Sequence, residues 1–223
     1  SFFDKVNTAK NEQTDTWFKG LDRVYNNFVY DYLYPNPASV LAFIENHDTD
    51  RFLGEGENLD MLKQASTLLL TTRRIPQLYY GTEVMMNGVK SKSDGYVRKD
   101  FPGGWTDDKE NALTPEGRTR LQNESYNFYR NLLNWRKGND VIAKGSMKQF
   151  MVQHGVYAYA RQYKGKTVFV LLNGTDKEVK LPLKYYAEVL KDKTQGKDVI
   201  SGKVTALNEE LTMAPRQSMV IEL

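Results

Sequence analysis

The feature that most constrains the fold of this chain is a change in residue pattern near Asn139. Before that residue, helix-like and strand-like segments alternate. After it, short stretches of high β-propensity follow one another, separated by turn signals such as HG, KGK, NGTDK, QGK and SGK. The turns recur about every 8 to 12 residues, which is typical of an antiparallel β-sandwich. We therefore predict two domains, residues 1–138 and residues 139–223.

Each β-rich stretch of the second domain is a candidate strand, because β-branched and aromatic residues fit a pleated surface. The candidates are KQFMVQ, VYAYARQY, TVFVLLNG, EVKLPL, AEVLKD, KDVISG, EELTMA and SMVIEL. His154 lies between the first two and is expected to be a hairpin turn residue.

The first 138 residues show helix, strand, helix and strand in that order, with short connections. Apolar residues recur on one helical face over residues 15–32 and again over residues 58–72. SVLAFI, residues 39–44, has no polar alternation, which is typical of a parallel strand buried on both faces. IPQLYYG, residues 75–81, is a second candidate strand. The order predicts a parallel α/β unit, so the predicted fold class is α/β followed by all-β.

The remainder of the first domain is a long loop followed by a helix. Residues 82–113 have little periodicity and many turn formers, and structureless loops of that length are usually functional. Thr114, followed by proline, is expected to cap the helix, which should end at Gly138. Trp17 and Trp135 fall in helical period and are expected in the core.

Composition excludes several classes of site. The 31 basic and 28 acidic residues are interspersed, so no basic stripe predicts nucleic-acid binding. The absence of cysteine and the two distant histidines make a zinc site improbable. No apolar run reaches the roughly 18 residues that a membrane helix needs. We expect no zinc site and no membrane or nucleic-acid partner.

One polar stretch, ENHDTDRF, directly follows the first predicted strand. It can be an ordinary turn, since Asn, Asp and Thr are common in loops. Catalytic groups of parallel α/β folds, however, lie at the carboxyl ends of strands, and a His-Asp pair there is a candidate functional site. The polar side chains around His47 are those of Glu45, Asp48 and Asp50.

The long loop holds a second group of candidates. Asp94 and Arg98, in SDGYVRKD, are suited to bidentate contacts with sugar hydroxyls, although a solvated turn would have the same composition. Trp105, in PGGW, is either an anchor for the loop or a platform on which a ring stacks.

The stretch FIENHDTDRF resembles the F-x-x-N-H-D block at the end of the seventh barrel strand in the α-amylase superfamily of glycoside hydrolases. Phe43, Asn46, His47 and Asp48 match that block. IPQLYYGTE resembles the eighth strand. DGYVRKDFPGGW, followed by GRTRLQNESYNFYRNLLNWRK, is similar to neopullulanases and related cyclomaltodextrin-degrading enzymes of gut Bacteroidetes. The resemblance is good over the first 138 residues and looser over the β-rich part.

This resemblance implies the last two strands and helices of a (β/α)8 TIM barrel, followed by a C-terminal β-sandwich. It implies a starch-degrading hydrolase that cleaves α-1,4, and as a second linkage α-1,6, glucosidic bonds with retention. Asp48 would stabilise the oxocarbenium-like transition state by a charge-assisted hydrogen bond. His47 would bind the same sugar, and Asn46 would be a further substrate-binding residue. Asp94 and Arg98 would bind a neighbouring glucose unit on the non-reducing side.

The family's nucleophile, an Asp, and its acid/base, a Glu, belong to motifs that this chain lacks. Retaining hydrolysis needs both groups about 5 to 5.5 Å apart, so we expect this chain alone to be inactive. Its expected partners are an α-glucan oligosaccharide and the rest of its own catalytic barrel. The resemblance implies no organic cofactor and no metal held by this chain, and it favours a periplasmic or extracellular location.

Two other functions remain open. The chain could be a non-catalytic carbohydrate-binding module that uses Trp105, Tyr96, Asp94 and Arg98. Alternatively, residues 139–223 only pack on the barrel and stabilise it.

Overall fold

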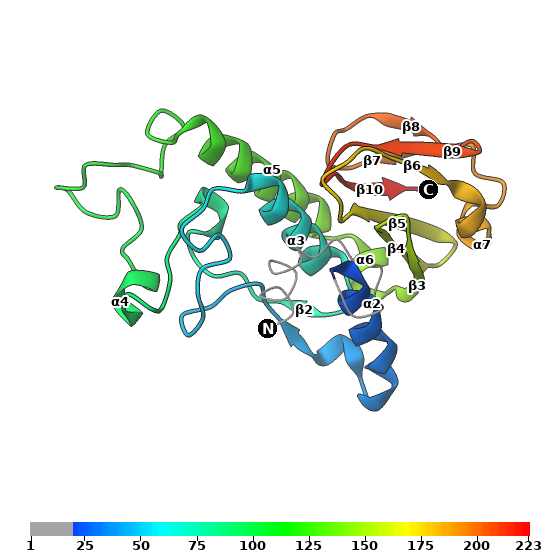
Figure 1. Cartoon of the computed structure of the whole chain (residues 1–223), viewed down its shortest axis with the longest axis horizontal. Helices are drawn as coiled ribbons and strands as arrows, with labels where there is room; N and C mark the ends of the chain where they lie inside the picture. The colour runs from blue at the N-terminus through cyan, green and yellow to red at the C-terminus, as the bar shows by residue number, and fades with distance from the viewer. Residues whose placement is uncertain (1–19) are drawn as a thin grey trace.

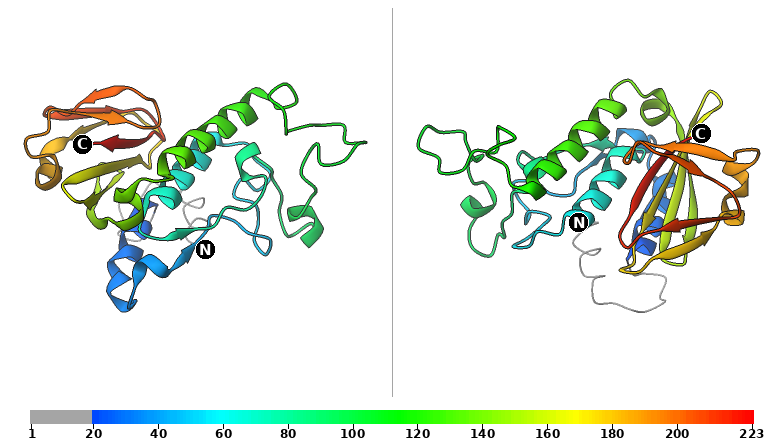
Figure 2. Two further views of the ribbon diagram at one scale, coloured as in Figure 1. Left: turned by 180° about the vertical axis from the view of Figure 1, so that it is seen from behind. Right: turned by 90° about the horizontal axis from the view of Figure 1, so that it is seen from above.

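The computed structural model describes residues 20–223 and shows a helical part beside an antiparallel β part (Figure 1). The elements of the helical part, in chain order, are α2 (Leu21–Val29), η2 (Tyr30–Leu33), η3 (Pro37–Ser39), β1 (Leu41–Ala42), α3 (Leu59–Thr71), β2 (Ile75–Pro76), η4 (Thr82–Val84), α4 (Asp94–Val97), α5 (Arg120–Arg136) and α6 (Asp140–Lys144). Helices α3 and α5 lie side by side between the sheet and the loops around α4 (Figures 1 and 2).

The β part contains two antiparallel sheets. Its elements are β3 (Ser146–Gln153), β4 (Val156–Tyr163), β5 (Lys166–Asn173), β6 (Val179–Pro182), η5 (Leu183–Tyr186), α7 (Ala187–Leu190), β7 (Gln195–Asp198), β8 (Val204–Ala206), β9 (Glu210–Met213) and β10 (Ser218–Glu222). Six strands form one sheet in the order β3-β4-β5-β10-β7-β8, and β6 pairs with β9 in the other. The expected antiparallel β architecture after residue 139 is therefore confirmed.

The β predictions were wrong in part. QGK, expected as a turn, lies in β7, and KDVISG is a strand only at Lys197 and Asp198. AEVLKD forms the short helix α7 instead of a strand, because Ala, Glu and Leu favour helix and because Val189 and Leu190 bury together against the sheet. Strand β8 was missed, since three residues at the edge of a sheet carry too little pattern to be seen in a sequence. His154 and Gly155 have φ of 52° and 76° in the two-residue turn between β3 and β4, as the hairpin prediction requires.

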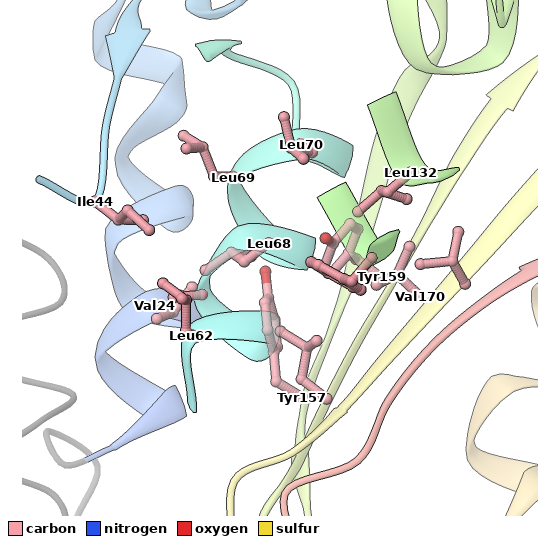
Figure 3. Packing of buried hydrophobic residues seen from close by; sticks show 14 of the residues in the cluster. Val24, Ile44, Leu62, Leu68, Leu69, Leu70, Leu132, Tyr157, Tyr159 and Val170 are labelled. Carbon is pink, nitrogen blue, oxygen red and sulfur yellow. The ribbon is translucent and has the colours of Figure 1, made fainter. Parts of the chain in front are cut away.

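The central strands β4, β5 and β10 of the six-stranded sheet are buried on both faces, and alternation along them sorts the side chains. On β4, Tyr157 and Tyr159 face the helices, where they join Leu62, Leu70 and Leu132 in one core (Figure 3). Val156, Ala158 and Ala160 face the opposite way and pack under the β6–β9 pair and α7. The helical part and the sheet therefore share a hydrophobic core.

In the helical part, α3 confirms the helix predicted over residues 58–72, and the Asn58 side chain caps it by accepting from the Met61 amide. The predicted helix at residues 15–32 is present from Leu21 onward as α2 and η2, whereas Trp17 lies outside the described residues. Trp135 is half-buried against the core and donates its indole N–H to Glu222.

The expected start of α5 was wrong. The helix begins at Arg120, six residues after Thr114, because Thr119 and Gln122 form a capping box in which each side chain accepts from the other's backbone N–H. The helix ends as expected just before Gly138, whose φ is 90°.

The two predicted strands pair in parallel, with Leu41 opposite Ile75 and Ala42 opposite Pro76. They are only two residues long, and the expected burial on both faces is wrong: Leu41 is 54% exposed and Ile75 is 48% exposed. Among the described residues each strand has a single neighbour, so part of the pair stays uncovered.

Candidate functional site

The turn that follows β1 holds two polar side chains out toward solvent. The Asn46 side chain accepts from the Asp48 amide at 2.8 Å, and the Thr49 hydroxyl accepts from the Asn46 amide at 3.0 Å. These bonds between neighbouring side chains and backbone make a tight polar turn. His47 and Asp48 lie at its tip, and each side chain is 60% exposed.

Arg98 joins this turn to α4. Its Nη2 donates to Asp48 Oδ1 at 3.0 Å and to Asp94 Oδ2 at 3.4 Å, while its Nε donates to the His47 carbonyl at 3.0 Å. His47 Nε2 lies 3.2 Å from Asp48 Oδ2. Residues that are about fifty positions apart in sequence thus meet in one group, which we call the Asp48 cluster: His47, Asp48, Asp94 and Arg98.

The Asp48 carboxylate is held but not saturated. One oxygen accepts from Arg98 and the other faces His47. A carboxylate offers about four acceptor positions, and Asp48 is more than half exposed, so acceptor positions remain for an incoming hydroxyl. Fixed carboxylates beside guanidinium and imidazole groups form charge-assisted hydrogen bonds with hydroxyl-rich ligands.

Loop packing explains how α4 presents its side chains. The Ser93 hydroxyl caps α4 by accepting from the Tyr96 amide, and Asp94 and Arg98 are spaced i, i+4, which places them on one side of the turn. Gly88 passes so close to Tyr96 that a Cβ would lie 2.6 Å from the Tyr96 carbonyl oxygen. Only glycine fits there without displacing the backbone.

Glu45 and Asp50 do not join the cluster, although they are close to it in sequence. Glu45 is 2% exposed and accepts from the Thr82 hydroxyl, the Phe52 amide and Arg51. Burial raises the pKa of Glu45, and these hydrogen bonds only partly oppose the rise. Asp50 accepts from the Lys90 amide at 2.6 Å. Both acids therefore hold the turn in place.

The structure does not bring Trp105 to the cluster. Its side chain is 64% exposed on the loop that follows α4, and its amide donates to Asp108 within that loop. Tyr96 is nearer, but the ammonium groups of Lys92 and Lys99 lie 4.6 and 3.9 Å from the centre of its ring. A ring with two lysines over it is a poor stacking surface for a sugar.

Arg51 is a residue of this region that sequence reasoning missed. It is 1% exposed, and its guanidinium lies 4.0 Å from the ring centre of Tyr79. The available signal was an arginine three residues after Asp48, but arginine is common in exposed turns, and nothing in the sequence marks this one as buried.

Two features are absent from residues 20–223. No group of three His, Cys, Asp or Glu side chains in that range is arranged to hold a metal ion. No helix in the same range has the length and apolarity needed to cross a bilayer.

Comparisons with known proteins show what this chain is similar to. A family model described as the cyclo-malto-dextrinase C-terminal domain matches residues 147–222. An α-amylase of Niallia circulans is 29% identical over 215 residues, which cover 93% of this chain and 37% of that protein. A cyclomaltodextrin glucanotransferase of Thermoanaerobacterium thermosulfurigenes is 32% identical over 172 residues, covering 77% of this chain and 21% of that protein.

Solved structures agree on the fold. An α-amylase of Anoxybacillus superposes with a TM-score of 0.75 at 18% identity, covering 99% of this chain and 45% of its own. A cyclomaltodextrin glucanotransferase with a three-domain ABC distribution superposes with a TM-score of 0.70 at 23% identity, covering 91% and 40%. This chain spans less than half the length of these relatives. It belongs to the α-amylase superfamily and matches a C-terminal portion of its members.

Proposed function

We propose that this chain is the C-terminal part of an α-glucan-degrading glycoside hydrolase of neopullulanase type. In this proposal residues 1–138 contribute the last two strands and helices of a (β/α)8 barrel, and residues 139–223 form its C-terminal domain. The parallel pairing of β1 with β2, with α3 between them in sequence, supports the barrel assignment. The exposed apolar side chains on that pair are suited to contact with further barrel strands.

The observation that carries the proposal is the Arg98 bridge. It holds Asp48 and Asp94 on one polar surface together with His47, following a strand that is paired in parallel. Asp48 and His47 bind the hydroxyls of the glucose unit at the cleavage point, and Asn46 shapes the turn that presents them. Asp94 and Arg98 bind a neighbouring glucose unit.

Asp48 contributes chiefly to the transition state. As the glycosidic bond breaks, positive charge develops on the sugar ring, and a carboxylate hydrogen-bonded to its hydroxyls then binds more strongly. The nucleophile and the acid/base are supplied by parts of the protein outside this chain, so the chain alone does not cleave the bond. The substrates are α-1,4-linked and α-1,6-linked glucans such as pullulan, cyclodextrins and starch oligosaccharides.

A stabilising role for residues 139–223 is part of the same proposal. The helix-facing side of the sheet shares its core with α3 and α5, as Tyr157, Tyr159 and Val170 show (Figure 3). A domain packed in this way raises the stability of the barrel segment without touching the sugar.

A carbohydrate-binding module without catalysis is the second candidate. It is favoured by Trp105, a large ring left 64% exposed on a loop of this chain. The lysines over Tyr96 weigh against it, because they occupy the second stacking surface that such a module would use.

Turnover by the natural protein that carries this chain tests the proposal, with maltoheptaose, a cyclodextrin and pullulan as substrates. We expect Asp48→Asn to lower kcat by about 10²–10³, as removal of a transition-state hydrogen-bonding group does, with a much smaller change in KM. Asp176→Asn is the control. Asp176 is also an exposed carboxylate paired with an arginine, Arg216, but it belongs to the β part and not to the Asp48 cluster. Near-normal turnover by Asp48→Asn would contradict the role of Asp48. Micromolar sugar binding without any turnover would favour the module.

A further inference from the structure

Arg51 is a buried charge in contact with three separate segments around the Asp48 cluster. It belongs to the turn that carries His47 and Asp48. Its Nη1 donates to the Tyr80 carbonyl at 2.6 Å, in the segment after β2, and its Nε donates to the Val97 carbonyl at 3.1 Å. Its own amide donates to Gly88 at 2.9 Å. One side chain thus ties together the turn, the segment after β2 and the end of α4.

The surroundings of Arg51 keep it in a single orientation. Its Nη1 lies 3.3 Å from Glu45 Oε1, and both side chains are almost completely buried. The guanidinium lies 4.0 Å from the ring centre of Tyr79 and 4.8 Å from that of Tyr80. Stacking and a planar fork of donors fix the plane of an arginine in a way that lysine cannot reproduce.

The contact at Val97 has a direct consequence for the cluster, because Val97 precedes Arg98. A displaced Val97 carbonyl moves the backbone from which Arg98 reaches Asp48 and the His47 carbonyl. Arg51 itself has no contact with His47 or Asp48 among the hydrogen bonds and ion pairs described for residues 20–223, so any effect on them passes through Arg98 and the turn.

We propose that Arg51 is a positioning residue that aligns Asp48 for reaction by fixing Arg98 through the Val97 carbonyl. This proposal rests on the function proposed above, since it assigns to Arg51 the alignment of a carboxylate that this function uses. Glu45 has the supporting role of compensating the buried charge of Arg51.

Kinetics of the natural protein on maltoheptaose test the proposal with Arg51→Lys. This variant keeps the charge beside Glu45 but loses the fork that reaches Tyr80 and Val97. A reacting group misplaced by about 1 Å costs up to about 10² in rate, so we expect kcat to fall at least about tenfold while KM changes less. Arg118→Lys is the matched control, because Arg118 also bonds a carbonyl, that of Ala112, and stacks on a ring, that of Tyr126, away from the cluster.

A double-variant cycle distinguishes positioning from a general structural effect. If Arg51 acts through Arg98, then Arg51→Lys has little further effect on kcat in the Arg98→Ala background. Losses that multiply in the double variant, or an unchanged kcat in Arg51→Lys, would overturn the proposal. If Arg51→Lys does not fold, Tyr79→Leu replaces it in the cycle, because that change removes the stacking surface under the guanidinium.

Hydrogen exchange separates this proposal from the proposed function. We expect the amides of residues 94–98 to exchange faster in Arg51→Lys than in the unaltered protein, and at the unaltered rate in Arg118→Lys. Unchanged exchange at residues 94–98 would overturn the role of Arg51 even in an active enzyme. An unaltered protein that turns over no α-glucan would instead refute the proposed function, while the exchange measurement would still decide the contacts of Arg51.

Discussion

At the scale of single residues, the buried tyrosines make a prediction about pH. Tyr159 is fully buried and shares a hydrogen bond with the Thr71 hydroxyl at 2.5 Å. Burial raises the pKa of Tyr159, and the bond to Thr71 opposes this only in part. An unfolded tyrosine releases its proton near about pH 10, whereas the folded protein retains it. The folded state therefore binds more protons above that pH, and the free energy of unfolding falls as the pH rises.

In Tyr159→Phe, we expect the free energy of unfolding to fall less steeply with rising pH than in the unaltered chain. Urea unfolding of the chain between about pH 8 and 11, a range that spans the ordinary tyrosine pKa, measures the slope. Tyr32→Phe is the control, because Tyr32 is 76% exposed and should leave the slope unchanged. A slope in Tyr159→Phe equal to that of the unaltered chain would show that Tyr159 ionises in the folded state.

The sequence predicts which polar residues lie near the candidate site, but not which of their side chains point to solvent and which point into the protein. The position of Asp48 after an apolar strand, and the pairing of Asp94 with Arg98 at i, i+4, are local facts that a sequence shows. The Glu45 side chain is held in the interior by the Thr82 hydroxyl and the Phe52 amide. The Arg51 side chain is held there by the Tyr80 and Val97 carbonyls. Such contacts are set by tertiary structure, so neighbouring charges in one short stretch end up in opposite environments.

At the scale of elements, the capping box predicts that Thr119, and not Thr114, stabilises the N-terminus of α5. Thr119→Ala removes the hydroxyl that accepts from the Gln122 amide, so we expect a loss of about 1 kcal/mol in the free energy of unfolding. Thr114→Ala, at the position that local sequence signals favoured, should cost less than about 0.5 kcal/mol. Denaturant unfolding of the two variants side by side checks this. Equal losses would mean that the helix starts earlier than residue 120.

Local signals predicted elements well where periodicity and caps agreed. Strand β4 coincides with VYAYARQY, and α3 has apolar residues in helical register with Asn58 as its cap. The failures arose where two signals competed. Thr114 with its proline resembles a helix start as much as Thr119 does, and only the reciprocal bond from Gln122 distinguishes them. The apolar residues of AEVLKD fit a strand as well as a helix.

At the scale of the whole molecule, the sheet and the helical part are interlocked. The buried guanidinium of Arg161, on β4, donates to the carbonyls of Thr71, Ile142 and Gly145, which lie at the ends of α3 and α6. Burial lowers the pKa of Arg161 to about 10, still well above neutral pH. The sequence predicted two kinds of structure with a change near residue 139, but it did not predict that they share a core. A strand that is apolar on both faces shows that each face is covered, but not which part of the chain covers it.

The central claim, that the Asp48 cluster binds the reacting sugar, is tested most directly by a crystal structure of the natural protein with acarbose. An α-amylase of Geobacillus thermoleovorans has been solved in complex with that inhibitor. We expect sugar hydroxyls within about 3 Å of the Asp48 carboxylate and the His47 imidazole, with Arg98 still bonded to Asp48. Acarbose bound elsewhere, for example on Trp105 or on the β sheets, with no sugar atom in contact with Asp48, would contradict the claim.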